Sequence, residues 1–303
     1  MKRMTCLLPT KERLKAMLRF IEKYVPRPTL VRSRLNRPGE LEASVVQWRR
    51  YGAFLAAAIA GWEDSECHLV HELLQLLTGA HRFTSRLLSA RPDQFRRDEL
   101  GLRTFVRALF LREASPEEAV AWLSRILLPW PLVFRAKLLY VLYGPCCQHA
   151  IFWDGPLFPQ TAQNSELLQK ALSELGSALR SLHEHGLGWT QDDTVTVLEE
   201  LIVLPREWLP QNAALVLSAC GLDISVLVLA SKLVNGRDAD VATTLFNMIL
   251  VEKRCATSAP LVLEVVCELR KLFAGHRHLA LMADMSDSLL RSALTYHALG
   301  ESR

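Results

Sequence analysis

The stretch SPEEAVAWLSRILLPWPLVFRAKLLYVLYGP, residues 115–145, indicates the fold class. Ser115 can cap a helix, Pro116 suits the first helical position, and two glutamates follow where the first helical turn favours acids. Apolar residues then recur at three- and four-residue steps to about residue 128, where Pro129-Trp130-Pro131 ends one helix and starts another. The second helix ends at Gly144-Pro145. This stretch therefore predicts two consecutive helices joined by a short turn.

The same periodicity runs along almost the whole chain, and the long apolar/polar alternation that a half-buried strand needs is missing. Half of the 303 residues are apolar, 22% are charged and 56 are leucines, which excludes disorder over most of the length and favours leucine-packed helices. The other expected helices span about 11–24, 43–60, 64–79, 81–90, 94–112, 165–185, 191–203, 206–219, 223–234, 238–255, 259–274 and 278–299. We therefore expect an all-α protein of about thirteen helices, in irregular stacked pairs that form a solenoid or a bundle, without a visible repeat consensus.

Several residues at helix ends have predicted structural roles. Thr190 with Asp193 resembles a capping box, and Asn235-Gly236 is a left-handed C-cap signal. Pro205 sits where a first helical residue is expected, with Trp208 buried beneath the turn that it starts. Five tryptophans next to proline or glycine are expected to clamp helix junctions to the core, and these are Trp62, Trp130, Trp153, Trp189 and Trp208.

Breaks in the helical pattern divide the chain into four expected parts. Residues 1–42 form a first helix and a basic linker, and residues 43–145 form a first helical half. Residues 146–164 form a long loop, rich in proline and aromatic residues, that its aromatic side chains pin to the core. Residues 165–303 form a second helical half.

The net charge of +4 conceals an uneven distribution. Residues 1–50 hold 13 Lys/Arg against 4 Asp/Glu, whereas residues 51–303 hold 23 against 28, so a basic excess is expected at the N-terminus only. This argues against a nucleic-acid groove along the molecule, because neutralising phosphates needs cations along the whole track. The weak candidates for partner binding are Arg27, Arg32, Arg34 and Arg37, which lack interleaved aromatics and fit a solvated linker or a contact with acidic protein better than a nucleic-acid arm.

Cysteine usage and hydropathy point to a reduced, intracellular protein, nuclear or cytoplasmic. The seven cysteines are an odd number without the spacing of a secreted disulfide scaffold. The apolar stretch near the N-terminus is too short for a signal peptide. Residues 53–60 are too few to span a membrane, and residues 213–234 include Asp223 and Lys232. We expect no membrane partner.

Motifs that carry chemistry are scarce. Cys67 and His71 lie one helical turn apart and could offer two metal ligands, but no second ligand cluster is nearby, which favours an ordinary helix with a buried cysteine and surface histidines. Phosphate-binding glycine loops, a zinc-protease helix and a nucleophile elbow are all missing from the sequence. We therefore predict no catalytic, cofactor-binding or metal-binding residue. An enzyme without a known motif should show a deep pocket with converging polar groups.

Several strings resemble the F-box only protein 47 family, with similar order and spacing from about residue 5 to at least residue 240. The strings are Leu7–Lys15, Gly61-Trp62-Glu63 with Glu66-Cys67-His68, Pro129-Trp130-Pro131, Trp189-Thr190 with Asp192-Asp193, Pro205–Leu209 and Ala230–Arg237. The resemblance implies a substrate-recognition subunit of an SKP1–cullin–F-box ubiquitin ligase, in a family associated with the germ line and meiosis. In that family an F-box lies upstream of the first string, which only six residues precede here. We expect the helical recognition region without the F-box that docks on SKP1.

The resemblance implies a non-enzymatic region that binds a protein partner or a ubiquitination substrate. The alternative is a helical scaffold that binds a germ-line structural or chromosomal protein without any ubiquitin role, with the basic first fifty residues as a steering patch.

Overall fold

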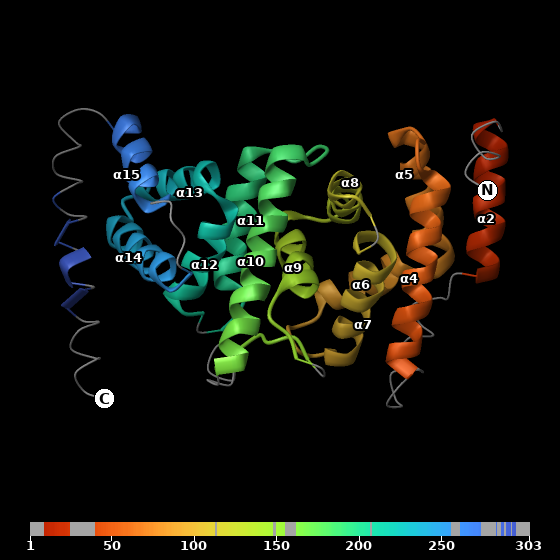
Figure 1. The fold of residues 1–303 in the computed structure, drawn as a ribbon, viewed down its shortest axis with the longest axis horizontal. Helices are drawn as coiled ribbons and strands as arrows, with labels where there is room; N and C mark the ends of the chain where they lie inside the picture. Colours follow the sequence, from red (N-terminus) through yellow and green to blue (C-terminus); the bar gives the residue numbers. More distant parts are fainter. Residues whose placement is uncertain are drawn as a thin grey trace. The chain divides into compact units, whose positions relative to one another are not determined.

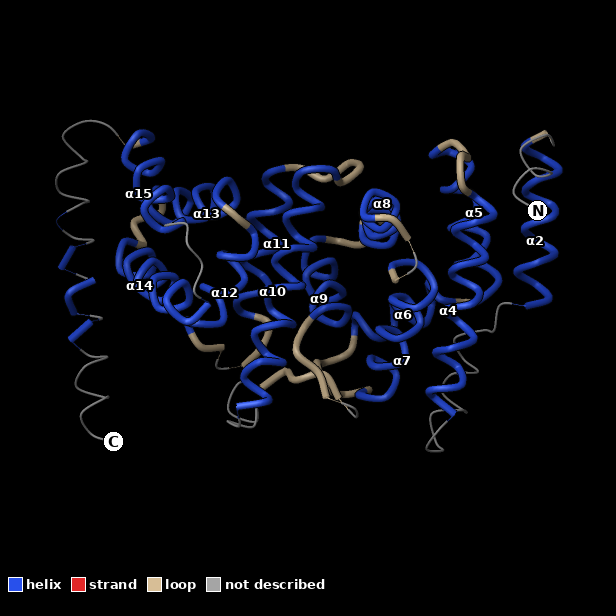
Figure 2. The backbone as a smooth tube through the Cα atoms, viewed as in Figure 1, coloured by secondary structure: helices blue, strands red, loops and turns tan. Residues whose placement is uncertain are grey.

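The computed structural model describes residues 9–24, 40–112, 114–147, 150–154, 162–206, 208–255 and 261–273, together with scattered positions between 283 and 294. Within these ranges the chain is helical, without a named strand, as Figures 1 and 2 show, which confirms the predicted all-α class. The elements are α2 (Thr10–Tyr24), α4 (Glu40–Ile59), α5 (Asp64–Thr78), α6 (Ala80–Ser89), α7 (Arg96–Val106), the π-helical turn η1 (Arg107–Leu111), α8 (Pro116–Leu127), α9 (Leu132–Tyr143), α10 (Ala162–His185), α11 (Gln191–Val203), α12 (Pro210–Cys220), α13 (Leu222–Val234), α14 (Asp238–Cys255) and α15 (Leu261–Leu272).

The chain forms two compact units. The first comprises Met1–Trp153 and His185–Trp189, and the second comprises Asp154–Glu184 and Thr190–Arg303. These units follow from packing, whereas the four expected parts rest on breaks in the helical pattern of the sequence and remain a prediction.

The second unit stacks its helices in a regular order. Helix α12 packs on α14, and α13 packs on both α11 and α15, so each of these helices meets the one two places further along the chain. Gly176 of α10 lies against α12, because an added Cβ would be 2.5 Å from the Val216 carbonyl oxygen. Such contacts between alternate helices are typical of a solenoid, which agrees with the expected stacked helix pairs.

The first unit is less regular. Helix α2 packs on α5, and its Phe20 ring stacks on Phe54 of α4 with ring centroids 4.1 Å apart. Helix α4 packs on η1 and α7, while α9 packs on both α6 and α7. Three leucines of α9, Leu138, Leu139 and Leu142, are completely buried. Helix α9 is therefore the central helix of this unit.

A π-helical turn interrupts the region where a single helix over 94–112 was expected. Helix α7 ends at Val106, and η1 follows over Arg107–Leu111. The backbone of η1 approaches α4 closely at Gly52, where an added Cβ would lie 2.6 Å from the Leu109 carbonyl oxygen and 2.7 Å from that of Ala108. A glycine is needed here because any side chain would displace these two carbonyl groups.

The predicted capping residues are confirmed at three positions. Ser115 forms a capping box with Glu118, and Thr190 forms one with Asp193 through two hydrogen bonds of 3.1 Å. Gly236 has a left-handed backbone with φ of 70°. These local signals act within three residues of a helix end, so the sequence is sufficient to specify them.

Two expectations near residue 205 are wrong. Helix α12 begins at Pro210 and not at 206, and Pro205 lies in a bend before Arg206, which forms an isolated parallel bridge with Asp154. Both prolines suit a first helical position, but the bridge holds Arg206 in an extended conformation, which leaves that role to Pro210. Trp208 is consequently half-buried and does not lie fully buried beneath a helical turn.

Element bounds differ elsewhere by a few residues. Helix α10 begins at Ala162, inside the loop expected over 146–164, and α4 begins at Glu40. Most of the helix expected over 278–299 lies outside the described residues.

Replacement of Gly52 by alanine tests the close approach of α4 and η1. Helix propensity alone would make Gly52→Ala stabilising by about 1 kcal/mol. We expect the opposite sign, a loss of about 1–3 kcal/mol in the free energy of unfolding measured with urea, because the new methyl group overlaps two carbonyl oxygens. Ala53→Gly, at an exposed position of the same helix, is the control and should lose about 1 kcal/mol. A raised unfolding midpoint for Gly52→Ala would contradict the described packing.

Candidate functional site

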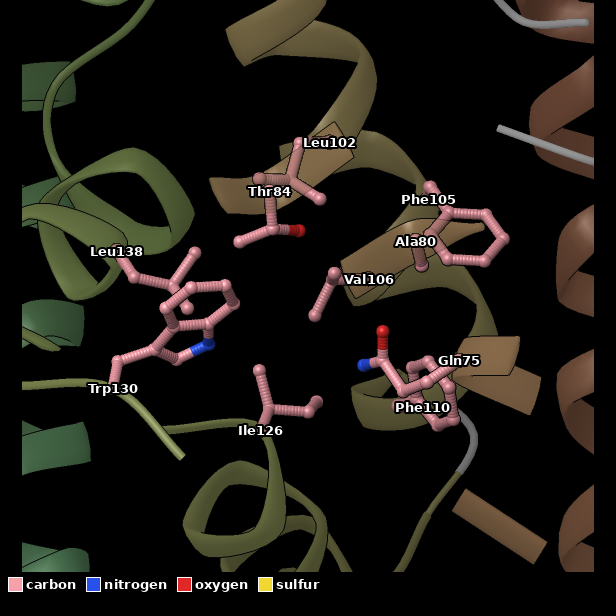
Figure 3. Close-up of a pocket in the computed structure, with 10 residues that line it drawn as sticks. All are labelled: Gln75, Ala80, Thr84, Leu102, Phe105, Val106, Phe110, Ile126, Trp130 and Leu138. Atoms are coloured by element: carbon pink, nitrogen blue, oxygen red, sulfur yellow. The ribbon is translucent and has the colours of Figure 1, made fainter. Parts of the chain in front are cut away.

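A small cavity lies among the helices of the first unit. Its volume is about 10 Å³, which is room for about one water molecule. Figure 3 shows apolar side chains around most of it, with the Gln75 amide and the Thr84 hydroxyl as polar groups on different walls. This cavity is not the deep pocket with converging polar groups that an enzyme without a known motif would need.

His71, one of the two potential metal ligands, is a core residue. It is 3% exposed, and its ring packs beside the rings of Phe110 and Trp122, with both centroid distances at 6.1 Å. The Gln75 amide nitrogen lies 3.1 Å from Nε2, so the neutral ring accepts a hydrogen bond there. Burial, with smaller contributions from His68 and Arg125, lowers the pKa of His71 to about 4. The imidazole is therefore neutral at physiological pH.

The neighbours of His71 do not complete a metal site. His68 is on the surface, with Nε2 3.5 Å from Glu72, and Cys67 is half-buried, where desolvation raises the pKa of its thiol. The expectation of a buried cysteine beside surface histidines is wrong for Cys67 and His71, because position 71 faces inward with Val70 and Leu74. No group of three or more His, Cys, Asp or Glu in the described part of the chain is placed to hold a metal ion.

A buried lysine caps the end of α6. Lys137 of α9 is 5% exposed, and its Nζ donates to the carbonyl oxygens of Leu87 and Leu88, each at 3.0 Å, and to that of Ala90. The last carbonyl groups of a helix lack partners within the helix and carry the negative end of its dipole. Lys137 satisfies three of them at once, although burial lowers the pKa of its ammonium group.

Two arginines, the buried Arg103 and the half-buried Arg135, cap two further helices of the same unit. Arg103 of α7 donates to the carbonyl oxygens of Val141 at 3.1 Å and Gly144 at 2.8 Å, at the end of α9. Arg135 of α9 donates to the carbonyl oxygens of Leu128 and Trp130, beyond the end of α8. Helix α9 thus supplies the caps of two helices and receives its own from α7.

Glu99 lies beneath this network. It is 1% exposed and accepts hydrogen bonds from the Trp153 indole at 2.9 Å and from the Asp93 backbone N–H at 3.2 Å. Burial raises the pKa of Glu99, while these hydrogen bonds and the nearby positive charge of Lys137 oppose that rise. The carboxyl group therefore fixes both the loop at Trp153 and the turn at Asp93.

Aromatic contacts anchor the loop that follows α9. The Tyr140 hydroxyl donates to the Phe152 carbonyl oxygen, and the rings of Tyr140 and Trp153 lie 4.7 Å apart. Trp153 is one of the aromatic side chains that the sequence predicted as anchors. Trp130 and Trp189 are also buried at junctions, and Trp62 is half-buried.

The sequence-based candidates for partner binding, Arg27, Arg32, Arg34 and Arg37, lie outside the described residues. The basic excess is also not limited to the N-terminus. Residues 80–112 hold 8 arginines against 3 acidic residues, although residues 51–303 sum to a negative charge. The net charge summed over residues 51–303 conceals this stretch. The net charge calculated over short successive segments would have revealed it.

The stacked helices define the class of protein as an all-α protein with a solenoid-like arrangement of helices. None of the helices in the described ranges combines the length and the apolar character needed to cross a bilayer. The family model described as FBXO47, ARM repeats, matches residues 78–296, and the chain belongs to that family. No solved structure matches it.

Two relatives support the family assignment. The chain is 35% identical over 273 residues to F-box only protein 47 of Mus musculus and 34% identical over 272 residues to that of Homo sapiens. In both comparisons the match covers 88% of this chain and 58% of the relative. The chain therefore spans less than three fifths of the length of these relatives.

The stability of the protein should depend on pH through His71. Its pKa is about 4 in the folded state and 6.5 in the unfolded state, so the unfolded state binds more protons between these values and stability falls as the pH is lowered. We expect a loss of about 2 kcal/mol in the free energy of unfolding between pH 7.5 and pH 5, from this residue alone. His71→Gln should flatten this part of the pH profile, whereas His68→Gln, at an exposed position, should not. Profiles of equal slope for His71→Gln and the unchanged protein would show that His71 is not the titrating group.

Removal of the Lys137 cap should be strongly destabilising. Lys137→Met keeps the side-chain volume but leaves three carbonyl groups uncapped and Glu99 without its neighbouring cation, which should cost about 3–5 kcal/mol by urea unfolding. Lys170→Met, at an exposed position, should change stability by less than about 0.5 kcal/mol. Adding Glu99→Gln to Lys137→Met should cost less than the sum of the two single changes. Additive losses would mean that Lys137 and Glu99 act independently.

Proposed function

We propose that this chain is the partner-recognition region of an F-box-type protein that acts in SKP1–cullin–F-box ubiquitin ligation in germ-line cells. The observation that carries the proposal is the family match over residues 78–296, which covers the helices from α6 onward. In this proposal the array binds a protein substrate and performs no chemistry.

The physical basis of such a function is proximity. A ligase of this kind raises the effective concentration of a substrate lysine near a ubiquitin-charged E2, and the recognition subunit needs only to bind and orient. A stack of helices suits this task, because its side chains present extended surfaces on a rigid backbone. The side-chain caps of α6, α8 and α9 contribute that rigidity, and the 10 Å³ cavity leaves no room for a small substrate at that place.

Docking on the ligase belongs to the same proposal. The family resemblance implies that SKP1 binds the F-box. The relatives are longer than the region matched here. SKP1 is thus the proposed partner of the whole protein, while the substrate is the proposed partner of the array.

The proposal can be tested in germ-line cells that express the tagged protein. Proteins captured with it should carry ubiquitin when the proteasome is inhibited, and their abundance should rise when the protein is depleted. SKP1 and the cullin should be isolated in the same complex. A captured protein whose ubiquitin content and abundance never change would instead favour a scaffold that binds a structural or chromosomal protein.

A further inference from the structure

An arginine-rich corner lies where α6 meets α7. The arginine face, as we name it, consists of Arg82 and Arg86 on α6, Arg91 in the turn, and Arg96 and Arg97 at the start of α7. All five side chains are exposed. Between residues 24 and 136 every basic side chain other than histidine is an arginine. Arginine differs from lysine in its planar fork of donors, which matches carboxylate and phosphoryl oxygens in pairs.

Arg86 holds the two helices of the corner together. Its Nη2 lies 2.7 Å from Oδ2 of Asp98 on α7, and its guanidinium lies 5.4 Å from the ring centroid of Phe83 and 5.2 Å from that of Phe95. The side chain nevertheless remains 44% exposed. Because Arg86 bridges α6 to Phe95 and Asp98, the arginines of both helices share one corner of the molecule.

The turn between the helices is held from beneath. Lys137 binds the last carbonyl groups of α6, and Glu99 accepts a hydrogen bond from the Asp93 backbone N–H. Asp93 has a φ of 68°, in the left-handed region that residues other than glycine rarely adopt. Such a conformation persists only where its surroundings fix it, so the arginine face is preorganised.

The acidic residues nearby offset only part of the charge of the arginine face. Asp98 is buried against Arg86, Glu99 is buried against Trp153, and Asp93 pairs with Arg96. Residues 82–99 thus hold the five arginines of the face against these three acids. Arg96 and Arg97 also occupy the first turn of α7, where the helix dipole disfavours cations. Two basic residues there oppose local stability, and such departures are expected at functional sites.

We propose that the arginine face binds an acidic segment of a partner protein, through carboxylate or phosphoryl side chains. Arginine clusters recognise acidic and phosphorylated motifs by charge-assisted, often bidentate hydrogen bonds. A single-stranded nucleic acid fits less well, because it needs exposed rings for base stacking. Phe83 is only 8% exposed, and Phe95 is half-buried beside Arg86. The inference rests on the proposed function, in which it names the class of substrate segment.

Fluorescence anisotropy with the purified full chain tests this directly. The probes are a labelled 12-residue peptide with six glutamates, the same peptide with phosphoserine in their place, a neutral glutamine version and a 12-nucleotide oligothymidine. The test variant is Arg82→Glu with Arg91→Glu, two exposed changes that spare the Arg86 contacts. The control is Lys170→Glu with Arg270→Glu, which changes the net charge equally at exposed positions of the second unit.

We expect the glutamate peptide, the phosphoserine peptide or both to bind. The peptide that binds more tightly shows whether the arginine face prefers carboxylate or phosphoryl groups. The test variant should weaken that binding by at least about tenfold, and the control by less than about twofold. Arg82→Lys with Arg91→Lys, which keeps the charge but loses the fork, should give an intermediate loss. Circular dichroism should show the same helicity and melting temperature for the test variant and the unchanged chain.

Four results would overturn the proposal: no binding of either anionic peptide, equal binding of the glutamine peptide, equal losses in the test and control variants, or tighter binding of oligothymidine that the test variant abolishes. The assay contains no ligase component. Its failure would therefore leave ubiquitination of captured proteins unaffected, while failure of the ubiquitin assay would leave peptide binding intact.

Discussion

The first unit depends on a buried lysine at the end of a helix. Lys137 projects from α9 onto the last carbonyl groups of α6, and Glu99 of α7 lies close enough to support its charge. Burying an ammonium group costs free energy, because the group loses its hydrating water. Three carbonyl oxygens replace that water around Lys137 and offset the cost. The same chemistry recurs where Arg103 caps α9 and Arg135 caps α8. These caps link α9 to the ends of α6 and α8, and α7 to the end of α9.

Much of the fold could be predicted from the sequence, and the successes share a short range. Ser115, Thr190 and Gly236 act on backbone groups within a few residues, so their chemistry can be read locally. The caps could not be predicted, since Lys137 and its acceptor Leu87 are 50 residues apart and any exposed lysine would look the same in the sequence. The π-helical turn inserts a residue that leucine periodicity does not resolve. At Pro205 and Pro210 the same local signal occurs twice, and the bridge between Asp154 and Arg206 decides between them.

The candidate interaction surface was harder to predict than the fold. Sequence reasoning placed the basic excess before residue 51, on arginines that the structure does not describe, whereas the arginine face arises from residues 82–97. The arginine face can be recognised only when the positions of the neighbouring acids are known. In the sequence, Asp98 and Glu99 look like exposed acids that would cancel the arginine charge, but in the fold both are buried. The buried network and the exposed surface are thus linked, because Lys137 and Glu99 hold the turn that joins the two helices carrying the arginines.

That link is the central claim, and native-state hydrogen exchange of the full chain tests it most directly. If Lys137 organises the corner, Lys137→Met should lower amide protection together across α6, α7 and the turn between them, by the same opening free energy. Protection in the second unit should be unchanged. Loss of protection limited to the last turn of α6, with α7 unaffected, would contradict the account.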